Sequence, residues 1–168
     1  MKLEKQFVSK DNKLYMLDGT EVPVVNASVL DAKFCVNEAS AQNVNVFACI
    51  ELPWTQIGCD EESYNEEFLA RFRDFFKALD EKKVFAFIVP VADKIPSSED
   101  EKDAFVASFK HCARRIKDCV SVAGFAVPSL ETGIDSSFFM EELSQKHEHY
   151  VFFSKDGNVL SDSSVVKF

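Results

Sequence analysis

The chain has 168 residues, of which 46% are hydrophobic and 28% charged, a balance typical of a folded domain and not of a disordered tail. We expect one domain over residues 1–168. The 28 acidic and 19 basic residues give a net charge of −9, which opposes nucleic-acid binding. Since no apolar run is long enough to span a bilayer and no signal-peptide pattern opens the chain, we expect a cytoplasmic protein without a membrane partner.

The first thirty residues are predicted to form short strands separated by turns. Asp11-Asn12 and Asp18-Gly19 lie between runs of β-forming residues, and these residue types tolerate the positive φ angles of tight hairpin turns. We therefore expect an N-terminal β-hairpin followed by a longer strand over residues 22–29. No clear periodicity follows over residues 31–42.

From residue 44 onward, apolar runs alternate with amphipathic segments. Ser63 and Glu66 have the spacing of a capping box, which predicts a helix up to about residue 82. Further helices are predicted from residue 97 to residue 119 and from residue 135 to residue 146. Apolar strands are predicted over residues 44–52, 84–91, 120–127 and 150–153, and Asp156-Gly157 predicts a C-terminal hairpin.

This alternation predicts the α/β class, because strands joined through helices form right-handed crossovers and a mainly parallel sheet. A complete eight-fold β/α barrel needs about 250 residues, more than this chain has. We therefore expect either a partial, half TIM-type barrel or an open, mainly parallel sheet, with β-hairpins at both ends.

Candidate site residues follow the predicted strands, since ligands bind beyond the carboxyl ends of parallel strands. Glu51 and Trp54 follow one strand, Asp93 the next, and Ser129 and Glu131 a third. Glu51 and Asp93 would form a carboxylate pair if they converge, or remain solvated loop acids if they do not. Trp54, the only tryptophan, either stacks on a sugar face or fills the core.

No metal or cofactor is expected. His147-Glu148-His149 resembles part of a metal site but lacks a third ligand, and the sequence has no glycine-rich phosphate loop. The cysteines are odd in number and form no CxxC pair, so buried, reduced thiols are predicted, with Cys112 and Cys119 on one helix face. The five cysteines are Cys35, Cys49, Cys59, Cys112 and Cys119.

Over residues 5–155 the order of elements resembles the N-terminal half of glycoside hydrolase family 5, the cellulase and mannanase family. Four segments carry the resemblance: the hairpin and first strand over 7–26, the strand end Ile50-Glu51-Leu52-Pro53-Trp54, the helix and strand over 66–91, and residues 109–125. The resemblance implies a fragment of that family's barrel.

The resemblance breaks at the fourth strand, which family members end with Asn-Glu-Pro, the glutamate being the catalytic acid/base. Aligned on Gly124-Phe125, the asparagine falls on Ser129 and the glutamate on Leu130, one residue before Glu131. The nucleophile belongs to a later strand that this length is not expected to include. The resemblance therefore implies a non-catalytic protein related to glycoside hydrolases, with Trp54 and Ser129 as candidate carbohydrate-binding residues.

Two alternatives stay open. A partial barrel leaves exposed sheet edges, which predicts a protein-interaction domain that self-associates, as a homodimer, through its open barrel. An active glycosidase requires two carboxyl groups flanking the scissile bond. Glu131 with either Glu51 or Asp93 is the candidate pair for that reaction.

Overall fold

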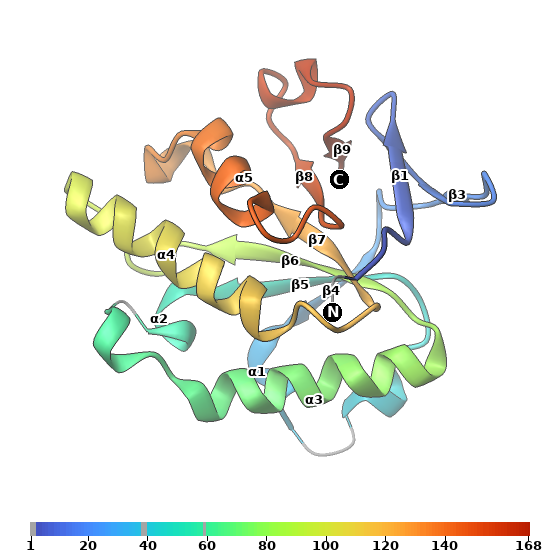
Figure 1. Cartoon of the computed structure of the whole chain (residues 1–168), viewed down its shortest axis with the longest axis horizontal. Coiled ribbons are helices and arrows are strands. Elements are labelled where there is room, and N and C mark those ends of the chain that lie inside the picture. The colour runs from blue at the N-terminus through green and yellow to red at the C-terminus, as the bar shows by residue number, and fades with distance from the viewer. Residues whose placement is uncertain (1–2, 38–39, 59) are drawn as a thin grey trace.

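The main body is a six-stranded sheet in which every neighbouring pair of strands is parallel (Figure 1). The computed structural model describes residues 3–37, 40–58 and 60–168. In spatial order, which is also chain order, the strands are β4 (Ser28–Asp31), β5 (Ala48–Pro53), β6 (Ala86–Val91), β7 (Val122–Ala126), β8 (Val151–Ser154) and β9 (Val166–Lys167). The predicted α/β class, a partial barrel or open parallel sheet, is confirmed.

A separate antiparallel sheet precedes this body. Its strands are β1 (Phe7–Lys10), β2 (Lys13–Met16) and β3 (Glu21–Val22). The predicted N-terminal hairpin is confirmed, and its turn residues Asp11 and Asn12 have φ angles of 53° and 61°. The longer strand expected over residues 22–29 is wrong, because Asn26, with a φ of 71°, makes a turn between β3 and β4.

The prediction of a C-terminal hairpin is also wrong, since β9 runs parallel to β8. The Asp156 carboxylate accepts a hydrogen bond from the Asn158 backbone N–H at 2.8 Å, and the chain then enters the 3-10 helix η4 (Val159–Ser161). Instead of reversing, the connection makes a wide excursion before β9 (Figure 1). Asp-Gly chemistry therefore produces a local turn here without a hairpin.

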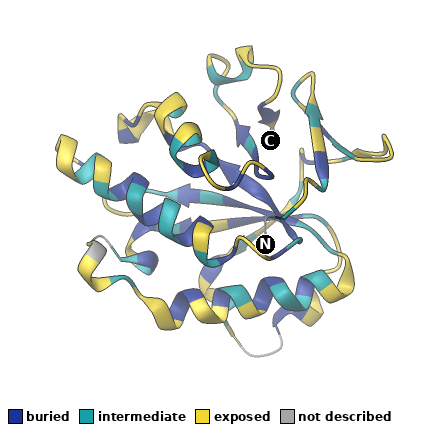
Figure 2. Cartoon of the chain, in the orientation of Figure 1, coloured by how far each residue is buried: buried dark blue, intermediate teal, exposed yellow. Residues whose placement is uncertain are grey.

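Within the described residues, five α-helices cover one face of the parallel sheet, and short 3-10 helices lie in several of the connections. In chain order they are α1 (Ala32–Cys35), α2 (Trp54–Ile57), α3 (Glu66–Lys82), α4 (Glu99–Arg115) and α5 (Ser136–Ser144), with 3-10 helices η1 (Ser40–Asn43), η2 (Glu61–Ser63) and η3 (Leu130–Thr132). The predicted apolar stripes are buried against the sheet while the outer helix faces are exposed (Figure 2). Among the described residues, no helix is both long and apolar enough to cross a membrane.

Helix α3 begins differently from the predicted capping box. The side chain of Asn65, not that of Ser63, accepts a hydrogen bond from the Phe68 backbone N–H, at 3.1 Å. The predicted starts of α4 and α5 hold, with Ser98 and Asp135 as their N-caps. Asn, Ser and Asp are all favoured at this position because their side chains satisfy an unpaired N–H.

The opposite, inner face of the sheet has a second apolar cluster. Phe87 of β6 stacks on Phe153 of β8 with ring centroids 4.1 Å apart and meets the edge of Phe168 at 5.1 Å. Phe7 of the N-terminal sheet packs on Phe85, directly before β6, at 4.9 Å. The N-terminal sheet thus lies beside the amino end of β6, away from the carboxyl end of that strand.

The thiols behave as small apolar core groups. Cys35, Cys49, Cys112 and Cys119 are buried and free, which confirms the prediction for these four, and Cys59 lies outside the described residues. Burial raises the pKa of the Cys35 thiol to about 12 and that of Cys49 to about 11. The shared helix face expected for Cys112 and Cys119 is wrong, because α4 ends at Arg115 and Cys119 lies in the following turn.

Candidate functional site

A cavity of about 840 Å³ lies on the inner face of the sheet. Strands β5 and β6 form part of its floor, while the segments that follow β7 and β8 form one wall. Its polar lining consists of Asn26, Glu51, Ser129, Glu131, Ser154, Lys155 and Asp156. The cavity therefore reaches the carboxyl ends of the strands, where parallel sheets bind ligands.

Alternation along the strands determines which side chains reach this cavity. Cys49 and Glu51 of β5 and Phe87 and Val89 of β6 line it, whereas the intervening Ile50 packs in the core under the helices. Successive side chains of a strand point to opposite faces, so Glu51 shares the inner face with Cys49. Glu51 is exposed within an otherwise largely apolar floor.

The segment after β7 holds the other two candidates in the cavity, Ser129 and Glu131. Ser129 precedes η3, and its carbonyl accepts hydrogen bonds from the Thr132 N–H at 3.1 Å and the Thr132 hydroxyl at 2.8 Å. Leu130, where the family resemblance places the acid/base glutamate, is 74% exposed and also lines the cavity. The structure thus brings Glu51, Ser129 and Glu131 together around one cavity.

Trp54 is not available to stack on a sugar. It is 1% exposed, its ring meets the edge of Phe105 at 5.2 Å, and its indole N–H donates to the Ser108 hydroxyl at 3.0 Å. The Ser108 hydroxyl in turn lies 2.9 Å from the Gly58 carbonyl oxygen and 2.8 Å from the Ala104 carbonyl oxygen, and it donates its proton to one of the two. Of the two alternatives left by the sequence, the core position is confirmed and the proposed sugar-stacking role is wrong, because Trp54 is buried between β5 and α4.

Asp93 does not line the cavity that holds Glu51. One of its carboxylate oxygens accepts a hydrogen bond from the Thr55 backbone N–H at 3.2 Å, and the other accepts one from the Thr55 hydroxyl. The carboxylate therefore stabilises the first turn of α2 and does not pair with Glu51, so of the two alternatives left by the sequence Asp93 is a loop acid. Of the candidate carboxylates, Glu51 and Glu131 share the cavity.

Sequence reasoning missed Lys155 and Phe168. The Lys155 ammonium lies 4.9 Å from the centroid of the Phe168 ring, a cation–π contact on the cavity wall. Lys155 directly follows β8, so the rule that selected Ser129 would also have selected it. Phe168 has no local signal, since it reaches the cavity only through the parallel placement of β9.

The histidine-rich segment is a buried structural cluster. His147 and His149 are 8% and 7% exposed, and His149 packs on Tyr150 with ring centroids 4.1 Å apart. Burial lowers the pKa of His149 to about 4 and, together with nearby Lys117 and Arg114, also lowers that of His147. Within residues 3–37, 40–58 and 60–168, no three His, Cys, Asp or Glu residues form a group suited to a metal ion.

Comparison with solved structures identifies the fold. A GH5_18 protein from Bifidobacterium longum subsp. infantis is similar with a TM-score of 0.55 at 8% identity, over 76% of this chain and 42% of that chain. The catalytic domain of an endoglucanase from Thermobifida fusca is similar with a TM-score of 0.59 at 12% identity, over 88% and 52%. The chain has the fold of a partial glycoside hydrolase family 5 barrel. The resemblance expected from the sequence is confirmed at this level.

A third solved structure is similar in fold and is also matched over only part of its length. The exo-beta-1,4-mannosidase from an Opitutaceae bacterium, strain TAV5, has a TM-score of 0.59 at 8% identity, over 94% of this chain and 36% of that one. The chain thus spans between about a third and a half of the length of these proteins. No family model and no curated protein matches the sequence.

Proposed function

We propose that this protein is a non-catalytic relative of glycoside hydrolases that binds carbohydrate in the inner-face cavity. The observation that carries the proposal is the convergence of Glu51, Ser129 and Glu131 on one cavity at the carboxyl ends of a family 5 type sheet. The carboxylates can accept hydrogen bonds from sugar hydroxyls and the serine hydroxyl can also donate them, while apolar floor residues such as Val89 can contact the C–H faces of the ring.

The absence of catalysis is inferred from the position that the resemblance assigns to the acid/base. Leu130 stands there with its side chain in solvent, and a leucine cannot transfer a proton. Asp93, a candidate for the second carboxylate, is bonded to Thr55 and lies outside the cavity lining. Glu131 with Glu51 remains as the alternative pair for an active glycosidase.

A related structure supports a β-linked disaccharide as the test ligand. A GH5_18 protein from Bifidobacterium longum subsp. longum, similar with a TM-score of 0.55 at 10% identity over 77% of this chain and 43% of that chain, holds Manβ1-4GlcNAc. The same disaccharide and cellobiose, titrated into isotope-labelled protein, are expected to shift the amide resonances of residues 129–131 and 154–156 at about millimolar concentration.

Variants identify the binding residues. Glu51→Gln and Glu131→Gln should each weaken binding by about tenfold, because each removes a charge-assisted hydrogen bond. Asp93→Asn, at an exposed acid outside the cavity lining, is the matched control and should leave the affinity unchanged. Absence of shifts at about 10 mM sugar, or equal weakening by Asp93→Asn, would contradict the proposal.

Hydrolysis is tested with the same sugars. The wild-type protein is expected to release no reducing ends from cello- or manno-oligosaccharides over an extended incubation. Release that is abolished by both Glu131→Gln and Glu51→Gln would replace the non-catalytic proposal with the glycosidase alternative, since both carboxyl groups are required for that reaction.

An interaction function is the second candidate, and exposed apolar side chains along the same cavity favour it. Val25, Val29 and Leu130 line the cavity and are 59%, 61% and 74% exposed. Apolar side chains gathered at one exposed place are typical of binding surfaces. Self-association through the open barrel, predicted from the sequence, is tested by sedimentation equilibrium, in which a monomer at all concentrations up to about 100 μM would exclude tight homodimers.

A further inference from the structure

The two outer strands of the parallel sheet, β4 and β9, differ in how far the rest of the chain covers their free edges. Beside β9, the Lys167 N–H donates to the Asn12 carbonyl at 3.0 Å, so the N-terminal hairpin turn covers this edge. For β4, no backbone hydrogen bond is found among the described residues beyond its ladder with β5 and the start of α1. The chain thus protects one edge of its open sheet and leaves the other free.

The free edge is exposed along its length. Ser28, Val29 and Asp31 are exposed, and Val29 shows 61% of its surface to solvent. An outer strand directs half of its backbone N–H and C=O groups away from its neighbour, and these groups form a template for another extended chain. β4 is therefore available for the addition of a strand.

The side chains along this edge specify what kind of strand would fit. Val29 is in register with Cys49, and Asp31 with Glu51, and Val29, Cys49 and Glu51 all line the inner cavity. Val29 faces this inner side, and the Asp31 carboxylate, which accepts a hydrogen bond from the Lys33 N–H at 2.7 Å and caps α1, lies at the carboxyl end of the same edge. An added strand would meet an apolar position first and, two residues on, a pair of carboxylates.

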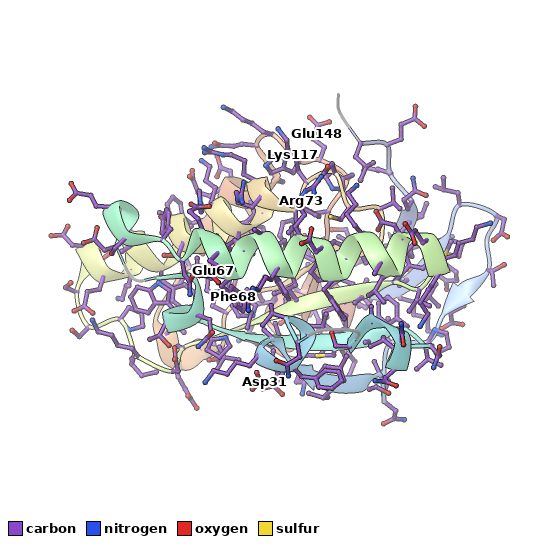
Figure 3. The ribbon with its side chains drawn as sticks, turned by 90° about the horizontal axis from the view of Figure 1, so that it is seen from below. Asp31, Glu67, Phe68, Arg73, Lys117 and Glu148 are labelled. Atoms are coloured by element: carbon purple, nitrogen blue, oxygen red, sulfur yellow. The ribbon has the colours of Figure 1, made fainter. Side chains whose placement is uncertain are left out.

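Lys155 lines the same cavity as Glu51, but in the part of the chain that the structure describes no cation is closely paired with either carboxylate of this edge, Asp31 or Glu51. Figure 3 shows Asp31 on the opposite side of α3 from Arg73 and Lys117, and Arg73 is itself bound to Asp118. The edge therefore presents negative charge beside an apolar site.

We propose that β4 binds an extended, basic segment of another protein by strand addition, with an apolar side chain beside Val29 and a Lys or Arg beside Asp31 and Glu51. This inference specifies the partner of the interaction function and does not depend on sugar binding. A second copy of the chain fits this edge less well, because it would bring its own Asp31 and Glu51, and a net charge of −9, to the same edge.

The test uses a labelled peptide, Thr-Lys-Thr-Val-Thr-Lys-Thr, which presents valine between two lysines on one face whichever way it runs. Fluorescence anisotropy with the full chain should give a Kd below about 1 mM. The control peptide with glutamate in place of both lysines should bind at least about tenfold more weakly. Hydrogen exchange should slow at the amides of residues 28–31.

Two variants locate the binding edge. Val29→Lys should weaken binding of the basic peptide at least about tenfold, because it places a cation on the edge and removes the apolar contact. Val8→Lys makes the same change on β1, where Val8 is 46% exposed, and should leave the affinity unchanged. Both sites are exposed, so both variants are expected to fold.

The remaining outcomes overturn the proposal. It fails if neither peptide binds, if the acidic peptide binds equally well, if Val29→Lys has no more effect than Val8→Lys, or if the amides of residues 28–31 are not protected. It also fails if sedimentation shows a dimer that Val29→Lys dissociates, because a second copy would then occupy β4. Glu131→Gln should weaken sugar binding and leave all the peptide readouts unchanged. Glu51→Gln should weaken the binding of both the sugar and the peptide.

Discussion

The side-chain amide nitrogen of Asn12 lies 2.7 Å from the carbonyl oxygen of Val165, 153 residues further along the chain. The same nitrogen lies 3.0 Å from the carbonyl oxygens of both Leu160 and Asp162. One side chain in the first hairpin turn therefore holds the whole excursion that leads into β9, and it does so with a φ of 61°, which asparagine tolerates well.

Asn12→Gly is expected to lower the free energy of unfolding by about 1–3 kcal/mol, because glycine keeps the positive φ but removes the amide that binds the C-terminal segment. Urea denaturation measures the change. Asp11→Gly is the control, since Asp11 has a φ of 53° in the same turn, and it should change stability by less than about 1 kcal/mol. Equal effects of the two variants would show that the turn alone matters.

Acid should destabilise the fold through His149. The unfolded chain binds a proton near the ordinary pKa of 6.5, whereas burial keeps the folded His149 neutral down to about pH 4. The free energy of unfolding should therefore fall as the pH drops from about 6.5 to about 4, by at most about 3 kcal/mol from this residue. Denaturation at pH 7 and pH 5 measures the loss.

His149→Phe isolates this contribution, because phenylalanine can keep the packing on Tyr150 and has no proton to bind. The variant should lose less stability than the wild type between pH 7 and pH 5. The remaining loss includes His147, whose pKa burial also lowers. Identical losses in wild type and variant would show that His149 does not control the acid response.

Gly124→Ala should destabilise the junction of β7 and β8 by more than about 3 kcal/mol. A Cβ atom at this position would lie 1.7 Å from the Val151 carbonyl oxygen, which is part of the neighbouring strand. Gly157→Ala is the matched control, because a Cβ there meets no heavy atom within 4 Å. Thermal unfolding of both variants tests the difference, and a stable Gly124→Ala protein would contradict the close strand approach.

Ser108→Ala should cost about 1–3 kcal/mol, because the buried Trp54 indole N–H loses its acceptor. Ser137→Ala, at an exposed position of α5, should have little effect on unfolding. Acrylamide should quench Trp54 fluorescence weakly in the folded protein and strongly after unfolding. Strong quenching of the folded wild type would place the indole in solvent and contradict its position in the core.

Local patterns in the sequence predicted most of the elements correctly. The amphipathic segment after Ser63 indicated α3, and the apolar run over residues 84–91 indicated β6, because these signals depend only on the spacing of neighbouring residues. The boundaries were less exact. Ser63 and Asn65 are both good caps two residues apart, and in the structure it is Asn65 that caps α3.

The structure brings together only some of the candidate residues. Glu51, Ser129 and Glu131, which the carboxyl-end rule selected, line one cavity, because parallel strands bring their ends together whatever their sequence. The same rule failed for Trp54 and Asp93. The Trp54 indole is hydrogen-bonded to Ser108 of α4, and the Asp93 carboxylate to Thr55 of α2. Such pairings depend on how a helix packs against the sheet.

By itself, the sequence determined the alternation of strands and helices and a mainly parallel sheet, either open or part of a barrel, because these features follow from the periodicity of neighbouring residues. Tertiary structure alone decided that β9 lies parallel to β8, that Phe168 forms a wall of the cavity, and that β4 stays uncovered while Asn12 covers β9. The physical reason is separation along the chain. These features depend on contacts between residues that lie far apart in sequence, whose approach no local pattern records.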